Sequence, residues 1–328
     1  MRLKTIVKVK LITLLKELLK LIEKINISIR KFIAHRKHGS VNDEQKSKLD
    51  MVSQLEKLSD TCEYYEIPVQ KGVVYSFKKN PHILIGGTTG YGKSYFTNYL
   101  IVMASIKGAN LFICDPKSSD LAGLDRVMPK EKVGVSKQEI LDLTKQVYKT
   151  MEERYKTMQE LKEEQNLFDG DFTTFNMPVA LLVIDELGAL TSSLDKKEKE
   201  EFDKHLKQLI LKGRQAGCFV CLITQQANAK NVPTEIRDQC GFRTFLGQPK
   251  LQDKAMVFGD GYEYIDRVYD KGEGLFLLDG VTDNPTLIQT PYYDGKELQN
   301  VYKYAFRNQE MYIHGDERLV ERITPKTM

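Results

Sequence analysis

The sequence predicts an α/β fold in which helices cover both faces of a mostly parallel sheet. From residue 73 onward, short apolar runs alternate with longer stretches of helical periodicity. This alternation is typical of a parallel sheet whose strands are joined by helical crossovers. A glycine-rich segment also lies between the first apolar run and the first helical stretch, as expected for a sharp turn from a strand into a helix. With 328 residues, the chain has room for one large domain with appendages.

The predicted elements alternate along the chain. The predicted strands are residues 83–85, 111–114, 179–184, 219–224, 274–278 and 286–289. The predicted helices are residues 49–58, 94–107, 136–164 and 197–215. Ser136 and Glu139 have the spacing of a capping box, which predicts where the longest of these helices begins. We therefore divide the chain into a basic amphipathic helix (1–37), a linker with a short helix (38–62), the α/β domain (63–295) and a C-terminal tail (296–328).

Residues 1–37 have the pattern of a basic amphipathic helix, with apolar side chains at helical spacing and lysines between them. Residues 1–38 contain eleven Lys or Arg against Glu17 and Glu23, a balance of +9, which leaves about −5 for the rest of a chain whose formal net charge is +4. The segment lacks both the run of about 20 apolar residues that a bilayer span requires and the features of a signal peptide. Two interpretations stay open: the helix packs on protein, or it lies on an anionic membrane surface.

The five cysteines are scattered and too few for a disulfide scaffold in a chain of this length. Cys218 and Cys221 lie in an apolar run that predicts a strand, where positions three apart point to opposite faces. We expect buried structural thiols rather than a redox pair or a metal site. The composition indicates a cytoplasmic protein, attached peripherally to the inner face of the cell membrane if the first helix binds lipid.

Residues 87–94 contain the pattern G-x-x-x-x-G-K-S, directly after a predicted strand and directly before a predicted helix. Glycines allow the backbone to curl so that successive N–H groups and the helix N-terminus face phosphate oxygens. Lys93 is expected to reach the β- and γ-phosphates of ATP, and the Ser94 hydroxyl to bind Mg²⁺. The predicted ATP-binding residues are Gly87, Thr88, Thr89, Gly90, Tyr91, Gly92, Lys93, Ser94 and, from a later strand end, Gln225.

Two further strands also end in polar side chains. Strand 179–184 is followed by Asp185 and Glu186; in an ATPase of this kind Asp185 would hold Mg²⁺ and Glu186 would polarise the attacking water. Strand 219–224 is followed by Gln225, which we expect to sense the γ-phosphate. Arg214, at the end of the preceding helix, could reach the nucleotide of a neighbouring subunit. The predicted catalytic residues are Lys93, Glu186 and Arg214, and the predicted metal ligands are Ser94 and Asp185.

Together these motifs resemble the motor domain of FtsK/SpoIIIE-type DNA translocases, including the coupling proteins of conjugative elements. The resemblance extends over roughly half of the chain, in the family's order. The matching residues are 80–94, 115–117 (Asp-Pro-Lys), 151–158 (Met-Glu-Glu-Arg-Tyr-Lys-Thr-Met), 183–186 (Val-Ile-Asp-Glu), 213–217 (Gly-Arg-Gln-Ala-Gly), 224–225 (Thr-Gln) and 241–244 (Gly-Phe-Arg-Thr).

The resemblance implies a RecA-like fold, a homo-hexameric ring with ATP at the subunit interfaces, and ATP-driven movement of DNA through the central pore. It favours Arg214 as an arginine that acts in the neighbouring subunit, with Arg243 as the alternative. Members of the cell-division branch carry transmembrane helices and a C-terminal winged-helix module, and we expect neither here. The resemblance therefore implies a compact translocase or coupling ATPase that serves conjugative transfer or maintenance of a mobile element.

The net charge gives no independent support for DNA binding, because the chain after residue 38 is acidic overall. Single- or double-stranded DNA, and a relaxase or secretion channel, are therefore partners that only the resemblance implies. Two other functions stay open: a nucleotide-gated adaptor at a membrane or secretion channel, and a plasmid replication helicase.

Overall fold

The computed structural model describes residues 51–225, 232–265, 267–291 and 298–309. The predicted amphipathic helix of residues 1–37 lies outside the described residues, and the division of the chain into four segments stays a prediction. No helix in the described ranges combines the length and the apolar character that crossing a bilayer requires.

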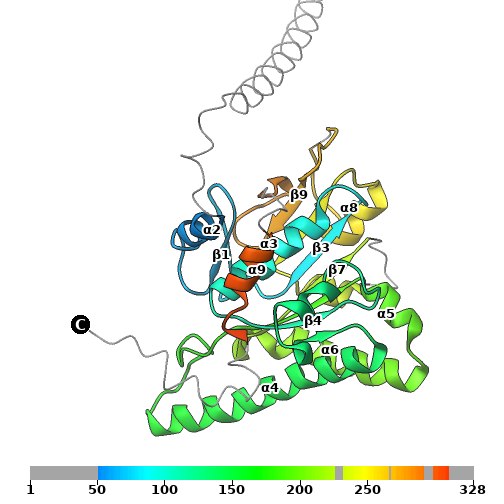
Figure 1. The fold of residues 1–328 in the computed structure, drawn as a ribbon. Helices are drawn as coiled ribbons and strands as arrows, with labels where there is room; N and C mark the ends of the chain where they lie inside the picture. The colour runs from blue at the N-terminus through cyan, green and yellow to red at the C-terminus, as the bar shows by residue number, and fades with distance from the viewer. Residues whose placement is uncertain (1–50, 226–231, 266, 292–297, 310–328) are drawn as a thin grey trace, which may run out of the picture. The chain divides into compact units, whose positions relative to one another are not determined.

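The described residues form helices and strands that alternate as predicted through most of the chain (Figure 1). The strands are β1 (Glu66–Gln70), β2 (Val73–Ser76), β3 (Ile83–Gly87), β4 (Asn110–Cys114), β5 (Val133–Gly134), β6 (Ala180–Asp185), β7 (Cys218–Thr224), β8 (Phe242–Leu246), β9 (Glu273–Leu278) and β10 (Thr286–Gln289). The helices are α2 (Met51–Ser59), α3 (Lys93–Ile106), α4 (Lys137–Glu164), α5 (Leu187–Ser193), α6 (Lys196–Ala216), α7 (Thr234–Arg237), α8 (Leu251–Phe258) and α9 (Leu298–Ala305), with 3-10 turns at Ala122–Arg126 and Lys130–Lys132.

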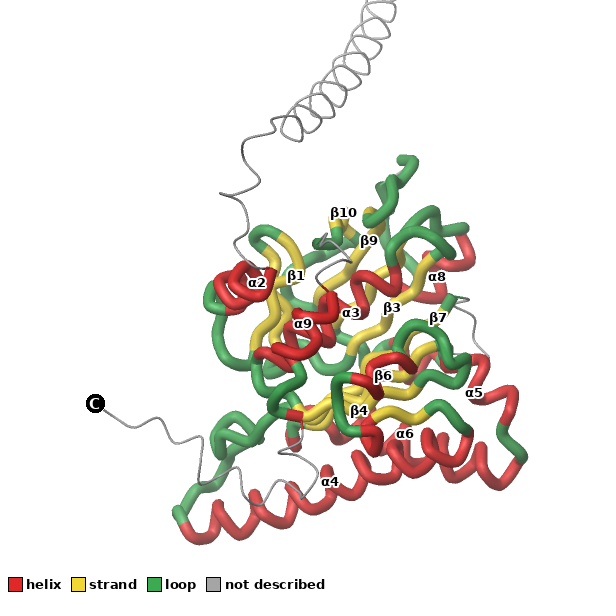
Figure 2. Tube along the Cα trace, in the orientation of Figure 1, coloured by secondary structure: helices red, strands yellow, loops and turns green. Residues whose placement is uncertain are grey.

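Within the described ranges, the main sheet has eight strands in the order β10-β9-β8-β3-β7-β6-β4-β5 (Figure 2). The strands from β8 to β5 in this order are parallel, and β9 and β10 add antiparallel pairs at one side. The inner strands are buried along their whole length, as expected when helices cover both faces of a sheet. The prediction of an α/β fold with a mostly parallel sheet is confirmed.

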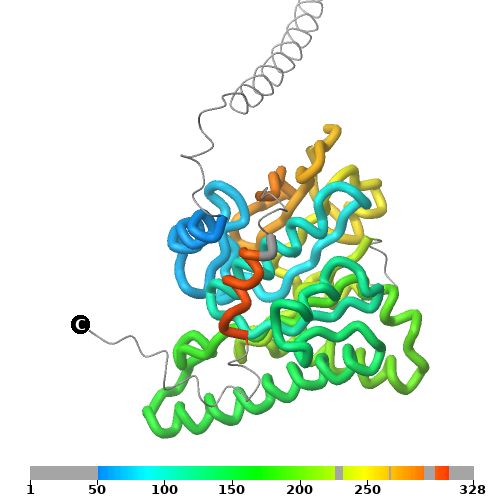
Figure 3. Tube along the Cα trace, viewed as in Figure 1, coloured from blue at the N-terminus to red at the C-terminus, as the bar shows by residue number. Residues whose placement is uncertain are grey.

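Helices pack on both faces of this sheet. The long helices α4 and α6 pack against each other and against β7 on one face, whereas α3 contacts β3, β4, α2 and α9. Figure 3 shows α9 beside α3 although the two are far apart in the sequence. The segment that follows α9 is anchored at the start of β4, because the Gln309 amide accepts from Leu111 N (3.0 Å) and donates to Ala109 O (2.8 Å).

The capping box predicted for the longest helix is present: Ser136 Oγ accepts from Glu139 N (3.3 Å), and Glu139 accepts from Ser136 N (2.8 Å). Strand β8 was not predicted, because two polar residues interrupt its apolar run. Both are buried and bonded, Thr244 to Leu275 O (2.8 Å) and Arg243 to Phe258 O (3.0 Å). The antiparallel hairpin β1–β2 was also not predicted.

Candidate active site

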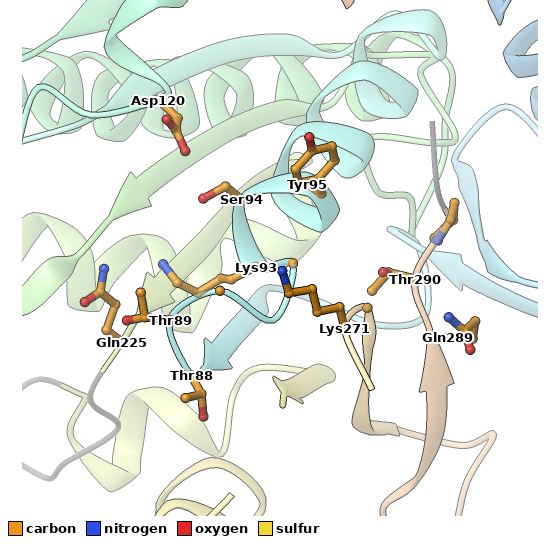
Figure 4. A pocket seen from close by; sticks show the side chains of 14 residues that line it. Thr88, Thr89, Lys93, Ser94, Tyr95, Asp120, Gln225, Lys271, Gln289 and Thr290 are labelled. Carbon is orange, nitrogen blue, oxygen red and sulfur yellow. The ribbon is translucent and has the colours of Figure 1, made fainter. Parts of the chain in front are cut away.

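The carboxyl ends of β3, β6 and β7 meet at one edge of the sheet, because the three strands are parallel neighbours. A cavity of about 480 Å³ opens at this edge. Figure 4 shows Lys93 between Thr89 and Gln225 on one side and Lys271, Gln289 and Thr290 on the other. Of the residues predicted to bind ATP, those that line the cavity are Thr88, Thr89, Gly90, Gly92, Lys93, Ser94 and Gln225.

The loop between β3 and α3 has a backbone that only glycine adopts without strain at two positions. Gly90 (φ 85°) and Gly92 (φ 97°) have left-handed conformations, which side chains with a Cβ rarely adopt. Gly92 is also the residue from which α3 starts, so the N-terminus of α3 and its N–H groups adjoin the cavity. This is the geometry that binds the phosphates of a nucleotide.

Gly87 and Tyr91 do not line the cavity. Gly87 is the last residue of β3. The Tyr91 ring lies over Gly247, where an added Cβ would meet Tyr91 Cγ at 2.5 Å. Tyr91 contributes to the loop through its backbone, since its carbonyl accepts from Gly272 N (3.0 Å). Tyr91 therefore ties the phosphate-binding loop to Gly272 through its carbonyl and to Gly247 through its ring.

Asp185 and Glu186 have different surroundings, as expected for different roles. Asp185 lies beside the phosphate-binding loop, with Lys93 Nζ 3.6 Å from its Oδ1. Glu186 is buried and has a left-handed backbone (φ 53°, ψ 63°), which costs about 1 kcal/mol or more in a residue other than glycine. Its Oε2 accepts from Gln225 N (3.1 Å) and lies 3.5 Å from Lys117 Nζ. The strained backbone aims this carboxylate along the edge of the sheet toward Gln225.

The chemistry at Asp185 suits a divalent cation. Burial raises the pKa of Asp185 above its usual value; Lys93 opposes this shift, and the nearby Asp115 and Glu186 add to it. A carboxylate and the Ser94 hydroxyl are the hard oxygen ligands that Mg²⁺ prefers, together with water and substrate phosphates. Within the described residues, no three His, Cys, Asp or Glu side chains converge as a metal site by themselves.

Asp115 belongs to the Asp-Pro-Lys motif, for which the sequence predicted no role. In the structure it organises the loop after β4. The fully buried carboxylate accepts from Lys117 N (3.2 Å), Ala122 N (2.9 Å) and Ser119 Oγ (3.1 Å). The same Ser119 hydroxyl is 3.4 Å from Asp185 Oδ2. Asp115 thereby places Lys117 next to Glu186 and Ser119 next to Asp185.

A family model described as the FtsK/SpoIIIE family matches residues 64–229. The chain belongs to the FtsK/SpoIIIE family. The phosphate-binding loop that lines the cavity makes it the candidate nucleotide site of this family member. The predicted family resemblance is thereby confirmed.

Curated relatives of this FtsK/SpoIIIE-family chain include two bacterial proteins. The "Ftsk domain-containing protein YdcQ" of Bacillus subtilis is 38% identical over 195 residues, 59% of this chain and 40% of that protein. The "DNA translocase FtsK" of Corynebacterium efficiens is 26% identical over 255 residues, 71% of this chain and 26% of that protein. The chain thus spans less than half the length of these two relatives.

Two solved structures share the fold of this FtsK/SpoIIIE-family chain. The pCW3 conjugation coupling protein TcpA, solved in a monomer form with ATPγS, has a TM-score of 0.58 and 19% identity, and the match covers 74% of this chain and 71% of that one. EssC ATPases 2 and 3 from Geobacillus thermodenitrificans have a TM-score of 0.54 and 17% identity over 74% of this chain and 46% of that one. These likenesses confirm the ATPase fold that the resemblance implied.

Sequence reasoning missed the far wall of the ATP site, whose residues come from the loop after β4, from the start of α3 and from the region of β9 and β10. The residues not predicted are Tyr95, Asp120, Lys271, Gly272, Gln289, Thr290 and Pro291. The C-terminal part of this wall is tied to the phosphate-binding loop, since Thr290 N donates to Gly272 O (2.7 Å) and Gly272 N to the loop. These residues belong to no local motif that predicts nucleotide binding, because only the fold brings them to the phosphate-binding loop.

Arg214 lies at the edge of the sheet opposite the ATP site. It belongs to the last turn of α6, directly before β7 begins, whereas Gln225 follows the end of β7. The seven residues of β7 separate the two edges by about 20 Å. The Arg214 side chain is exposed and donates to Lys78 O (3.3 Å). The structure therefore does not bring Arg214 to the ATP site of its own chain.

Arg243, the alternative to Arg214, has a buried guanidinium. It donates to Phe258 O (3.0 Å) and to Asp279 Oδ1 (3.2 Å). These contacts hold the side chain within its own chain, so Arg214 is the better candidate for an arginine that acts in a neighbouring copy.

Proposed function

We propose that this chain hydrolyses ATP with Mg²⁺ between neighbouring copies of itself and uses the reaction to move DNA. The observation that carries the proposal is the position of Glu186, a buried carboxylate at the carboxyl edge of the sheet. It accepts from the backbone N of Gln225, a residue that lines the cavity, and lies 3.5 Å from Lys117 Nζ. A site that only bound nucleotide would not need a base at this position. The curated relatives named DNA translocases support the choice of DNA as the cargo.

Each residue of the site has one task in this proposal. Lys93 leaves Asp185 for the β- and γ-phosphates, and the N-terminus of α3 binds the same anion. Asp185 and Ser94 would hold Mg²⁺, which neutralises charge on the phosphate oxygens. Glu186 orients the attacking water and accepts its proton. The Gln225 side chain contacts the γ-phosphate, while its backbone N donates to Glu186 Oε2. Gln225 thereby links the γ-phosphate to the base.

The position of Arg214 supports assembly of several copies. Since its guanidinium lies about 20 Å from its own site across the sheet, it can stabilise the transition state only in another copy. Repetition of such a head-to-tail contact closes a ring when the rotation between copies brings the last copy back to the first, and we propose a hexamer. The likeness to a conjugation coupling protein supports a role in a mobile element, at the cytoplasmic side of the cell membrane, with relaxase or channel partners.

An ATPase assay without DNA, with single strands and with duplexes of increasing length tests this proposal. We expect duplex DNA to stimulate hydrolysis about tenfold or more, with longer duplexes more effective, because a moving motor stays bound for many cycles. Displacement of a third strand from a triplex would report the movement itself. Hydrolysis that ignores DNA of every length would overturn the proposal, and unwinding of the duplex would replace it with the helicase alternative.

A further inference from the structure

Neighbouring elements donate hydrogen bonds to the C-terminal end of α6. The last four carbonyls of a helix have no partner within the helix. Here all four accept hydrogen bonds. Gly217 N donates to the carbonyls of Gly213 and Arg214. The other two bonds are Phe172 N to Gln215 O (3.0 Å) and Arg154 Nη1 to Ala216 O (3.0 Å).

Two further bonds fix the preceding turn of α6. Tyr155 Oη donates to Lys212 O (2.7 Å). His82 Nε2 lies 2.9 Å from Ile210 O, while its Nδ1 accepts from Val220 N (3.1 Å). Because Nδ1 is the acceptor, Nε2 carries the proton and donates to the carbonyl. The last two turns of α6 are therefore held by α4, by His82 directly before β3 and by the loop before β6.

Arg154 and Tyr155 are neighbours in the Glu-Arg-Tyr element, one of the motifs in which the sequence resembles the family. Arg154 is 3% exposed, and its guanidinium lies against the C-terminal carbonyls of α6, the negative end of the helix dipole. Removing such a charge from water is costly, and well-packed apolar residues often stabilise a fold as well as a buried charge does. The arrangement points to a need for accurate placement of the end of α6.

Arg214 is one of the side chains that this end exposes to solvent, together with Lys212 and Gln215. On the inner side of the same turn, Gly213 packs against β7 so closely that an added Cβ would lie 2.0 Å from Cys218 O. On the outer side, the Arg214 guanidinium donates to Lys78 O (3.3 Å). The packing of Gly213 on β7 and the hydrogen bonds to the last carbonyls of α6 thus fix the backbone of Arg214, while its side chain stays accessible.

We propose that Arg154 and Tyr155 are positioning residues for Arg214. By holding the last turn of α6, they fix the height and direction at which the Arg214 guanidinium meets the nucleotide of the neighbouring copy. The proposal rests on the proposed function, because it takes Arg214 to act in another copy. A displacement of about 1 Å in such a group lowers turnover by as much as about a hundredfold, so the end of α6 must not fray.

A double-mutant cycle tests the proposal. The variants are Tyr155→Phe, Arg214→Ala and the two together, with kcat and KM for ATP measured with and without duplex DNA. We expect Tyr155→Phe to lower kcat about tenfold and to change KM less than about twofold. In the Arg214→Ala background the same change should have no further effect, because the group that Tyr155 positions is already gone.

Tyr148→Phe is the matched control, since Tyr148 is also on α4 and contacts α6 at His205 (ring centroids 4.8 Å apart), away from the end of the helix. It should leave kcat unchanged. Arg154→Gln is a second positioning variant, and Tyr155→Phe remains decisive if Arg154→Gln fails to fold. Wild-type kcat in Tyr155→Phe or in Arg214→Ala, or an equal loss in both backgrounds of the cycle, would overturn the proposal. Because the cycle is also run without DNA, its result is separate from a failure of DNA to stimulate hydrolysis.

Discussion

The two edges of the central sheet differ in how firmly their polar groups are held. At the carboxyl edge, Lys93 and Asp185 are 3.6 Å apart and Lys117 and Glu186 are 3.5 Å apart, beside an open cavity. At the amino edge, the bonds of His82 and Arg154 to α6 are 2.9 and 3.0 Å long, and both side chains are buried. The long ion pairs beside the cavity can be exchanged for contacts with a ligand, whereas breaking one of the short bonds to α6 would leave a buried polar group unpaired. We infer that the carboxyl edge binds nucleotide and that the amino edge presents Arg214 to the nucleotide of a neighbouring copy.

The largest expected effect is at the carboxyl edge. Lys93→Ala should abolish measurable ATP hydrolysis and weaken nucleotide binding, because it removes the cation that reaches the β- and γ-phosphates. The melting temperature should change little, since the ion pair between Lys93 and Asp185 is long, at 3.6 Å. A fluorescent ATP analogue reports binding, and phosphate release reports hydrolysis. Residual turnover near the wild-type rate would contradict the assignment of this edge.

Glu186→Gln separates binding from hydrolysis. The amide oxygen can still accept from Gln225 N, but the side chain can no longer take a proton from water. We expect kcat to fall about a thousandfold, equivalent to about 4 kcal/mol, with ATP affinity preserved. Normal DNA transport by this variant would mean that turnover is not needed, and the adaptor interpretation would then replace the motor.

His82 makes the amino edge sensitive to acid. Burial lowers the pKa of His82 to about 4, against the opposing effect of the bond to Ile210. An unfolded histidine titrates near pH 6.5, so the unfolded chain binds a proton first, and stability is lost as the pH falls from about 6.5 to about 4. The loss should approach about 3 kcal/mol.

Denaturant unfolding at pH 7 and pH 4.5 measures this loss. His82→Asn is the comparison variant, because Asn tolerates the left-handed backbone of this position (φ 54°). The variant should be less stable at pH 7 and should lose less stability on acidification. An identical pH dependence in both proteins would show that His82 does not cause it.

The smallest expected effect has the opposite sign and lies at the carboxyl edge. Because the pKa of Asp185 is raised, chiefly by burial, stability is lost as the pH rises from the pKa of an unfolded aspartate, about 3.9, through the raised pKa, and the loss is complete above it. Asp185→Asn should therefore stabilise the chain at pH 7, by about 1 kcal/mol or less, while it impairs hydrolysis. A fall in melting temperature at pH 7 would show that the charge contributes to the fold and not only to the site.

The sequence predicted the carboxyl edge better than the amino edge for a physical reason. The phosphate-binding loop, Asp185 and Glu186 each adjoin an apolar strand, so their proximity follows once the strands are parallel neighbours. Arg154 instead bonds a carbonyl 62 residues away, and no local pattern encodes that contact. Lys271 and Thr290 were missed likewise, because antiparallel strands late in the chain bring them back to the loop. The sequence motifs contain Asp115, Arg154 and Tyr155, but only the hydrogen bonds in the structure indicate what each side chain does.

Mixing two variants with impaired hydrolysis tests most directly whether the two edges form one site across neighbouring copies. Lys93→Ala lacks the phosphate contact but keeps Arg214, and Arg214→Ala has the reverse defect. Random assembly at equal amounts should pair an intact cavity with an intact Arg214 at about a quarter of the interfaces. The account predicts that the mixture regains hydrolysis up to about a quarter of the wild-type rate. No recovery at any ratio, from subunits shown to assemble together, would contradict it.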